Sequence, residues 1–197
     1  MTTEPKPANG SWLAALRPFL DSRVIAMCFL GFSAGIPLLL IFSSLSLWLR
    51  EAGVDRGAVT FFSWAALGYS FKFVWAPLID RLPLPLLTRW LGRRRSWLLV
   101  AQLAIASAIL LMAAIDPAQG GSSLTHMALA AVMLGFSAAT QDIVIDAYRI
   151  EAAETSLQAM MSATYIAGYR VGMVVSGAGA LYLAAALGST AEHYVFA

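Results

Sequence analysis

The sequence predicts an all-α membrane protein, and composition, run length and periodicity together lead to this fold class. Hydrophobic residues make up 59% of the 197 residues and charged residues only 12%, whereas a typical soluble domain is about 25% charged. Apolar runs long enough to cross a bilayer as helices recur along the chain, and none alternates with the period of two expected of a barrel strand. An ordinary soluble enzyme, a disordered chain and a disulfide-stapled secreted module are therefore excluded.

Five apolar runs predict five transmembrane helices, since about 20 apolar residues cross the hydrocarbon as a helix. The first run carries no charge and is too long for the apolar part of a signal peptide, so we expect it to remain uncleaved. Lys72 alone interrupts the second run and Arg170 alone the fifth, while the fourth carries charges in its second half. The expected spans are about 24–48, 58–79, 96–115, 126–150 and 157–187, with the start of a sixth at 192.

The distribution of lysine and arginine predicts a cytoplasmic N-terminus, because cytoplasmic segments of membrane proteins carry an excess of basic residues. Residues 1–23 then form a cytoplasmic tail, and residues 24–197 form a transmembrane half-bundle. With this orientation only Arg50 and Arg56 lie in outer connections. The cytoplasmic segments carry Lys6, Arg17, Arg23, Arg81, Arg89, Arg93, Arg94, Arg95 and Arg149.

Three charged residues of the fourth span form one polar stripe. Asp142, Asp146 and Arg149 fall within about 60° of one another around a helix. Asp142 lies eight residues before Ile150, which places it about 12 Å deep at the helical rise. A charge at that depth is costly, so we expect Asp142 to carry a coupling proton or to anchor a polar ligand. Asp146 is a second candidate for proton coupling, although it can also form a local ion pair with Arg149.

Arg170 lies near the middle of the fifth span and cannot lose its charge, so it needs an anionic partner. Asp142 or Asp146 could supply the partner, and so could a carboxylate of the substrate. Tyr165 and Tyr169 flank Arg170 in the sequence. Each is a candidate for ligand contact, with simple helix packing as the alternative.

Lys72 and Gln141 complete the set of candidate substrate-binding residues. Lys72 lies seven residues before Ile79, so it could line a cavity and attract anions, or extend its stem to the membrane surface. Gln141 precedes Asp142 directly and adds a neutral polar group at the same depth.

Small residues in the first and fifth spans predict close helix packing. Such residues let helix backbones approach each other, and Pro37 should kink the first helix. They are Gly31 and Gly35 in the first span and Gly168, Gly172 and Ser176 in the fifth.

The sequence lacks the motifs of an enzyme or a metalloprotein. It contains no phosphate-binding glycine loop, no HExxH pair and no GxSxG elbow, and its one cysteine, Cys28, lies in an apolar run. An intramembrane aspartyl protease would need two aspartates from different helices, whereas Asp142 and Asp146 share one. We therefore expect no cofactor, no metal and no catalytic activity. The basic run 93–95 is explained by membrane topology and anionic lipid and does not indicate nucleic acid.

Several segments resemble one transporter family. The stretch 138–151 (AATQDIVIDAYRIE) is similar to the fourth helix of the AmpG-type muropeptide permeases of the major facilitator superfamily. The segments GFSAGIPLLL (31–40), WLREAGV (48–54), KFVWAPLIDR (72–81), GRRRSWL (92–98) and GYRVGM (168–173) extend the resemblance from about residue 20 to the end.

This resemblance implies a major-facilitator-type helix bundle that imports anhydro-muropeptides with protons across the bacterial inner membrane. Eukaryotic acetyl-CoA transporters are a related branch and supply the alternative substrate. The resemblance also implies a cytoplasmic gate motif, here Asp80 and Arg81 followed, after ten intervening residues, by Gly92, Arg93 and Arg94. Arg149 is grouped with this gate.

The family implies two halves of six helices or more, with the substrate bound between them. This chain resembles the first half without most of its sixth helix. The expected partners are therefore the lipid bilayer, a small glycopeptide, protons, and either the missing C-terminal half or a second copy. A half-transporter that serves as a scaffold without transporting is the rival interpretation.

Overall fold

The computed structural model describes residues 17–62, 67–187 and 195, and within these ranges the regular structure is entirely helical. The elements are η1 (Arg17–Leu20), α2 (Ser22–Leu39), η2 (Leu40–Leu45), α3 (Ser46–Glu51), α4 (Arg56–Phe62), α5 (Leu67–Arg81), α6 (Leu87–Leu91), α7 (Arg93–Ala113), η4 (Pro117–Gln119), α8 (Gly121–Ala152), α9 (Thr155–Val174), η5 (Val175–Gly179) and α10 (Ala180–Leu187). The predicted all-α class is confirmed.

Four helical stretches in the described part of the chain have the length and apolar composition needed to cross a membrane. They are Ser22–Glu51, Arg93–Ala113, Gly121–Ala152 and Thr155–Leu187, and they lie over the first, third, fourth and fifth expected spans. The second expected span is divided between α4 and α5, and residues 63–66 between them lie outside the described residues. The start of the sixth, at 192, also lies outside them. The count of five spans and a sixth therefore stays a prediction.

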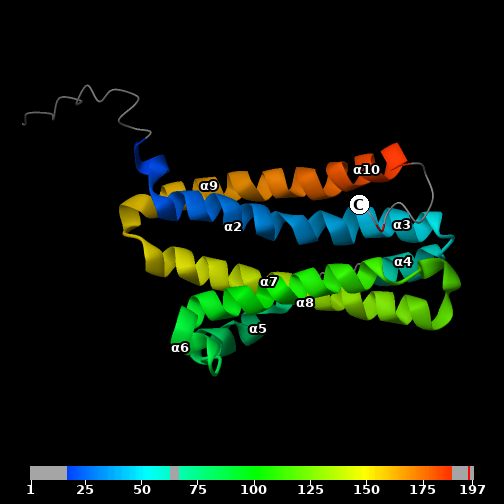
Figure 1. Ribbon diagram of the computed structural model, residues 1–197, viewed down its shortest axis with the longest axis horizontal. Helices are drawn as coiled ribbons and strands as arrows, with labels where there is room; N and C mark the ends of the chain where they lie inside the picture. Colours follow the sequence, from blue (N-terminus) through cyan, green and yellow to red (C-terminus); the bar gives the residue numbers. More distant parts are fainter. Residues whose placement is uncertain (1–16, 63–66, 188–194, 196–197) are drawn as a thin grey trace, which may run out of the picture.

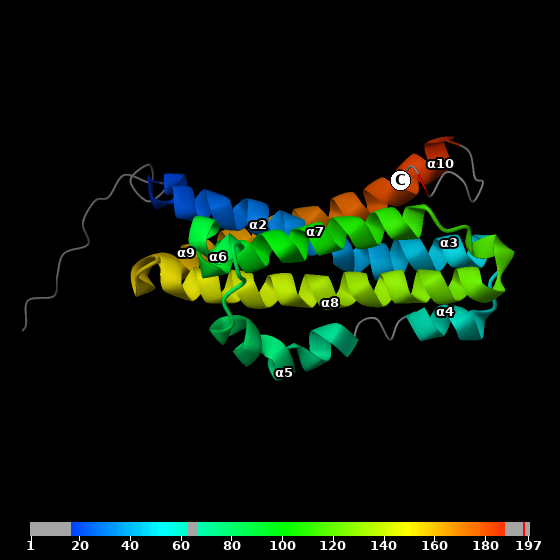
Figure 2. The same ribbon diagram turned by 60° about the horizontal axis from the view of Figure 1, so that its bottom comes forward.

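The long helices are arranged as two pairs. Helix α2 lies beside α9 and runs in the same direction, while α7 lies antiparallel to α8 (Figures 1 and 2). Helix α5 packs on α8 (Figure 2). Helix α8 is the central helix. In its most apolar part 67% is buried, whereas 39% or less is buried in the most apolar part of each of the other three stretches. The residues of α8 can therefore face several helices at once.

Glycines bring α2 and α9 into close contact, as predicted. A Cβ atom on Gly31 or Gly35 would overlap a carbonyl oxygen of α9, and one on Gly168 or Gly172 would overlap a carbonyl oxygen of α2. Because the four positions alternate between the two helices, the backbones touch along about two turns. This contact fixes α9 against α2 and thereby sets the positions of Tyr165 and Tyr169 on α9.

Both helices of this pair contain a π-helical segment in the half that follows the glycines. In the first stretch the segment is η2, which begins three residues after Pro37. Proline lacks the backbone N–H that would continue the α-helical ladder at its own position. The second segment, η5, packs against η2, and the Ser44 hydroxyl donates to the Ser176 carbonyl at 3.4 Å.

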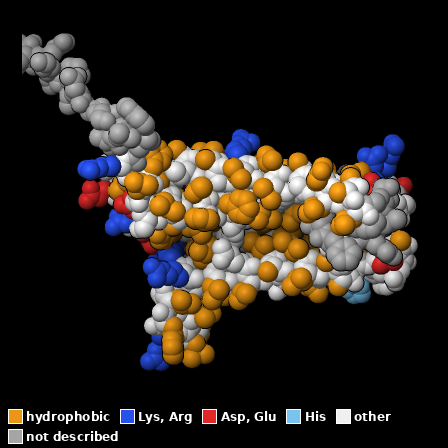
Figure 3. Space-filling model, turned by 45° about the horizontal axis from the view of Figure 1, so that its top comes forward, with side chains coloured by type: hydrophobic (Ala, Val, Ile, Leu, Met, Phe, Trp, Pro, Cys, Tyr) orange, Lys and Arg blue, Asp and Glu red, His pale blue; other side chains and the backbone are white. Residues whose placement is uncertain are grey.

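The molecular surface is apolar along its length and charged toward its ends. Figure 3 shows hydrophobic side chains over the long middle of the molecule, with charged side chains gathered mainly at the two ends. Large apolar side chains such as Phe29, Leu110 and Val174 are exposed there. This distribution is the one expected of a bundle surrounded by lipid.

Candidate translocation site

Polar side chains from three helices meet beside the second half of α8. We call this group the polar cluster; it consists of Lys72 and Tyr69 from α5, Asp142, Asp146 and Arg149 from α8, and Ser162, Tyr165 and Tyr169 from α9. The predicted stripe on α8 is thus brought against two other helices. Of the described charged residues that the sequence places within spans, Lys72, Asp142, Asp146 and Arg149 lie in this one place.

Asp142 is the deepest acid of the polar cluster. It is half-buried, and its Oδ1 accepts a hydrogen bond from the Tyr165 hydroxyl at 3.3 Å. Tyr69 and Tyr169 also lie within electrostatic range of its carboxylate. One tyrosine hydroxyl therefore binds this carboxylate directly, an arrangement that can hold a proton or a polar ligand.

Asp146 lies one turn nearer the end of α8 and forms two ion pairs. Its Oδ2 is 3.9 Å from Lys72 Nζ, and its Oδ1 is 3.5 Å from Arg149 Nη2. Arg149 also donates a hydrogen bond to Ser162 Oγ on α9. The local pair of Asp146 with Arg149 is confirmed, and it extends to α5 through Lys72. About half of the Asp146 side chain (52%) is exposed, so the cluster is open on this side.

Lys72 therefore faces the polar cluster through its contact with Asp146. Its side chain is 38% exposed and points to Asp146, and its charge also acts on Asp142. A lysine placed between two carboxylates can change partner with a small rotation of its stem. This is a different role from a free cation that waits for an anionic substrate.

Gln141 lies behind the cluster. Its side chain is fully buried, its Nε2 donates to Ser33 Oγ on α2 at 3.4 Å, and its Oε1 has no hydrogen-bond partner among the described residues. The residue joins α8 to α2. Direct substrate binding by Gln141 stays a prediction.

Arg170 does not join the polar cluster through any contact. Its side chain is exposed, and it forms no ion pair or hydrogen bond with a described residue. Asp146 is held by Lys72 and Arg149, and Asp142 by Tyr165. The pairing of Arg170 with one of these aspartates, considered from the sequence, is therefore not formed.

Sequence reasoning missed Tyr69, Ser33 and Ser162. Tyr69 lies three residues before Lys72, so helical spacing alone places both side chains on one face of α5. Its hydroxyl is buried without a hydrogen-bond partner among the described residues. Ser162 and Ser33 carried no such signal, because only the packing of α9 and α2 on α8 brings them to this site.

A second group of charges lies at one end of the bundle. Arg94 Nη1 is 2.6 Å from Asp80 Oδ1, and Arg94 Nη2 is 2.5 Å from Glu151 Oε1. Arg94 thereby joins the beginning of α7 to the ends of α5 and α8. We call Asp80, Arg94 and Glu151 the Arg94 network. Gly92 directly precedes α7 with φ 79°, a backbone conformation that glycine adopts without strain.

The predicted gate residues are only partly brought together. Asp80 and Arg94 form the network, whereas Arg81 and Arg93 are exposed and form no ion pair with a described residue. Arg149 contacts Asp146 and Ser162 of the polar cluster and not Arg94, and its part in the gate stays a prediction. Glu151, which was not singled out from the sequence, takes the place beside Arg94.

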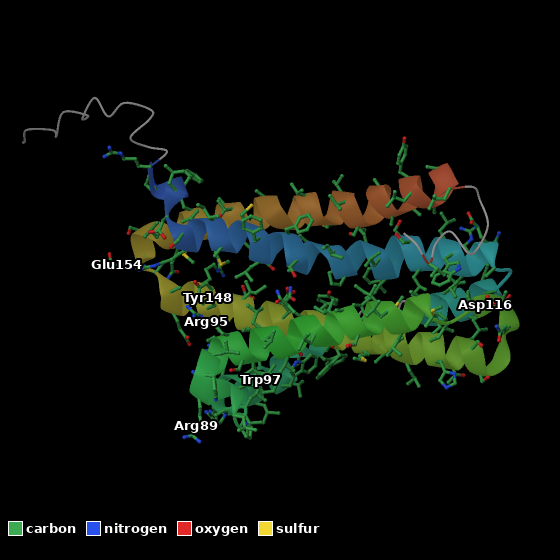
Figure 4. The ribbon with its side chains drawn as sticks, in the orientation of Figure 1. Arg89, Arg95, Trp97, Asp116, Tyr148 and Glu154 are labelled. Atoms are coloured by element: carbon green, nitrogen blue, oxygen red, sulfur yellow. The ribbon has the colours of Figure 1, made fainter. Side chains whose placement is uncertain are left out.

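The charges of the described chain also divide between its ends. Arg89, Arg95 and Glu154 lie at the end that holds the Arg94 network, and Asp116 lies at the opposite end (Figure 4). No three described His, Cys, Asp or Glu residues come together in a way that could hold a metal ion. The polar cluster brings together carboxylates, cations and hydroxyls that can bind protons, form ion pairs and donate hydrogen bonds.

Comparison with known proteins covers almost the whole chain. Residues 24–195 match the model of a family described as acetyl-coenzyme A transporter 1. Over 171 residues the chain is 42% identical to the protein named "Putative transporter AmpG 4" of Rickettsia conorii. This match covers 87% of this chain and 40% of that protein. It is 39% identical over 169 residues to the anhydromuropeptide permease of Escherichia coli, covering 86% of this chain and 33% of that protein. The chain thus spans well under half the length of these relatives.

Proposed function

Because this chain belongs to the acetyl-coenzyme A transporter 1 family, and AmpG-type permeases are among its relatives, we propose that it forms one helix bundle of a secondary active transporter. The transported compound is an anhydro-muropeptide, which enters the cytoplasm together with protons across the bacterial inner membrane. The polar cluster carries the proposal, because ionisable groups placed inside a membrane protein mark paths for protons and polar solutes.

In the proposed mechanism Asp142 is the residue that binds and releases the coupling proton. Asp142 lies ten residues before the end of α8, about 15 Å along the helix from that end. Asp146, one turn nearer that end, receives or relays the proton. When Asp142 is ionised, Lys72 can turn from Asp146 toward it, and protonation of Asp142 returns Lys72 to Asp146.

The substrate is proposed to bind against the tyrosines of α9 and the charges of α5 and α8. A sugar–peptide fragment carries hydroxyls, amides and carboxylates, which tyrosine hydroxyls and Lys72 can bind. The Tyr165 and Tyr169 rings lie with centroids 6.0 Å apart and are tilted by 38° to each other, and either ring can pack against a sugar. Gln141 contributes by holding α2 to α8 through Ser33.

The Arg94 network is proposed to act as a cytoplasmic latch. It joins the ends of α5, α7 and α8 by two short ion pairs. Breaking these pairs would let the three helices separate and open the site toward that end. The N-terminus would then be cytoplasmic, as the basic residues predict.

Uptake of labelled anhydro-muropeptide into energised membrane vesicles tests the proposal. Vesicles are compared with and without a protonophore, with labelled acetyl-CoA as the second substrate because the family description names it. Because substrate sites of such transporters lie between two bundles, the chain is tested alone and together with the C-terminal half of the Escherichia coli relative. Protonophore-sensitive uptake of the muropeptide supports the proposal, uptake of acetyl-CoA replaces the substrate, and uptake of neither favours the non-transporting scaffold.

A further inference from the structure

The segment that connects α5 to α7 exposes large apolar side chains. It comprises residues 82–91 and includes the short helix α6, and we call it the connecting segment. Leu86 and Trp90 are 74% and 88% exposed, and Leu82 and Leu91 are also exposed. Figure 3 shows hydrophobic side chains over the part of the molecule that protrudes here. An apolar surface of this kind indicates contact with a membrane or with a partner.

The backbone of the connecting segment holds these side chains outward. The Trp97 indole donates a hydrogen bond to the Leu82 carbonyl at 2.9 Å, which ties the beginning of the segment to α7. The Leu87 N–H donates to the Pro85 carbonyl at 2.8 Å across a tight turn centred on Leu86. Leu86 has φ 69° and ψ −57° there, a strained conformation for a residue other than glycine. The turn leads the chain into α6 and leaves the Leu86 side chain exposed.

The connecting segment lies beside the bundle and not beyond its end. Helix α6 extends sideways from the beginning of α7, and the turn between α8 and α9 reaches further along the long axis than α6 does (Figures 1 and 2). Because the long helices are expected to cross the membrane along this axis, α6 is placed at the level of the membrane surface. Tryptophan is enriched at that level in membrane proteins.

Three arginines accompany the exposed apolar residues. Arg81 ends α5, Arg89 lies in α6 and Arg93 begins α7. All three are exposed, and none forms an ion pair with a described residue. Figure 4 shows Arg89 on α6, pointing away from the bundle. The two acids of the Arg94 network are already paired with Arg94, so the connecting segment carries an excess of positive charge.

We propose that the connecting segment is an interfacial anchor that binds anionic phospholipids. Leu86 and Trp90 enter the membrane just below the headgroups, and Arg89, with Arg81 and Arg93 on either side, binds the headgroup phosphates. The lipids belong to the leaflet at which α5 ends and α7 begins, which the basic residues predict to be the cytoplasmic one.

This contact differs from the general contact between membrane spans and lipid tails. It lies outside the spans, and it selects lipids by the charge of their headgroups. The inference goes beyond the proposed transport activity, because it requires only that α5 and α7 meet this membrane surface. It holds whichever compound is transported.

Fluorescent labels in lipid vesicles test where the connecting segment lies. Cys28 is replaced by Ser, and a single cysteine at Leu86 or at Trp90 carries an environment-sensitive dye. Glu154→Cys, at the same end of the molecule, is the control for water, and Leu110→Cys, which is 70% exposed on α7, is the control for lipid. The whole chain is reconstituted in phosphatidylcholine mixed with phosphatidylglycerol, and quenching by lipids with brominated acyl chains is measured.

The labels at positions 86 and 90 should behave like the label at position 110. Their emission should be shifted to the blue, and brominated lipid should quench it, whereas the label at position 154 should emit as in water. Emission at 86 and 90 that matches position 154 would overturn the inference. A blue shift without quenching by brominated lipid would show that protein covers the segment, and would overturn it too.

The charge of the headgroup is tested with the label at position 86. A basic residue close to an anionic membrane surface strengthens binding by about fivefold. Brominated phosphatidylglycerol should therefore quench this label better than brominated phosphatidylcholine does. The preference should fall by about fivefold in Arg89→Gln and persist in Arg56→Gln, which removes an exposed arginine of α4.

Equal quenching by the two lipids, or the same preference in Arg89→Gln, would overturn the proposed recognition of anionic headgroups. The label at position 110 is measured in each arginine variant, so that failed insertion is not mistaken for lost lipid binding. The experiment contains no transported compound. Its failure therefore leaves the proposed transport untouched, and absence of uptake leaves the anchor untouched.

Discussion

The Tyr165 hydroxyl donates a hydrogen bond to Asp142 Oδ1 at 3.3 Å and joins α9 to α8 near the middle of the bundle. Tyr165 is placed there by the glycines of α2, because its own carbonyl lies where a Cβ on Gly31 would be. The close packing of α2 with α9 and the surroundings of Asp142 are therefore one structural feature. A change that separates the two helices should also disturb the carboxylate.

Replacing Asp142 with Asn should separate proton coupling from substrate binding. Asn keeps the size and the acceptor for Tyr165 but cannot take up and release a proton. We expect vesicles with Asp142→Asn to exchange labelled muropeptide for unlabelled muropeptide but to lose accumulation driven by a pH gradient. Asp116→Asn, at the opposite end of the molecule, is the control. Wild-type accumulation by Asp142→Asn would remove this residue from the coupling mechanism.

Replacing Lys72 with Gln should weaken the joint between α5 and α8. The substitution removes the partner of Asp146 on α5 and leaves Arg149 as its only described cation. Because the pair is partly exposed, the expected loss of stability is about 1 kcal/mol or less. Transport should fall much further if Lys72 changes partner during the cycle. Uptake and thermal unfolding are measured together, and equal small effects on both would contradict a coupling role.

Replacing Gly168 with Ala should destabilise the bundle. The new Cβ would overlap the Cys28 carbonyl, so α2 and α9 must move apart, at a cost of about 1–3 kcal/mol. Gly179→Ala is the matched control, because a Cβ there meets nothing within 4 Å. Thermal unfolding in detergent should show a clearly lower Tm for Gly168→Ala only. Equal Tm values for the two variants would show that the helices tolerate separation.

Replacing Arg94 with Gln should open the cytoplasmic end. The substitution leaves Asp80 and Glu151 beside each other without the cation that joins them. Since both acids are about half exposed, we expect a loss of about 1–2 kcal/mol in stability. Arg93→Gln removes the same charge from an exposed position and should have little effect. Cysteine labelling near the ends of α5 and α8 measures the opening, and similar labelling of both variants would count against the latch.

The predicted orientation can be measured directly. Alkaline phosphatase fused after Gln119 should be active, because this connection is expected outside the cytoplasm, where the enzyme forms its disulfides. A fluorescent protein fused to the N-terminus should be fluorescent in the same cells. Inactive phosphatase after Gln119, with an active fusion after Leu91, would reverse the orientation.

The sequence alone determined the helical class and the main membrane-crossing stretches. These features are local: the length of an apolar run, the helical period and the cost of a charge in lipid are all properties of consecutive residues. The stripe of Asp142, Asp146 and Arg149 was found in the same way, and so was the close packing implied by Gly31 and Gly168. Helical spacing could also have found Tyr69 beside Lys72.

The tertiary structure decided which helices meet, and with that the partner of each charge. A sequence gives the depth and the helix face of a residue but not the helix that lies opposite. The position of α5 against α8 allows Lys72 to pair with Asp146. The position of α8 against α7 allows Arg94 to pair with Glu151. Arg170, like Asp142, lies far from the ends of its helical stretch, yet its side chain is exposed. It is exposed because the opposite side of α9, which carries Gly168 and Gly172, packs against α2.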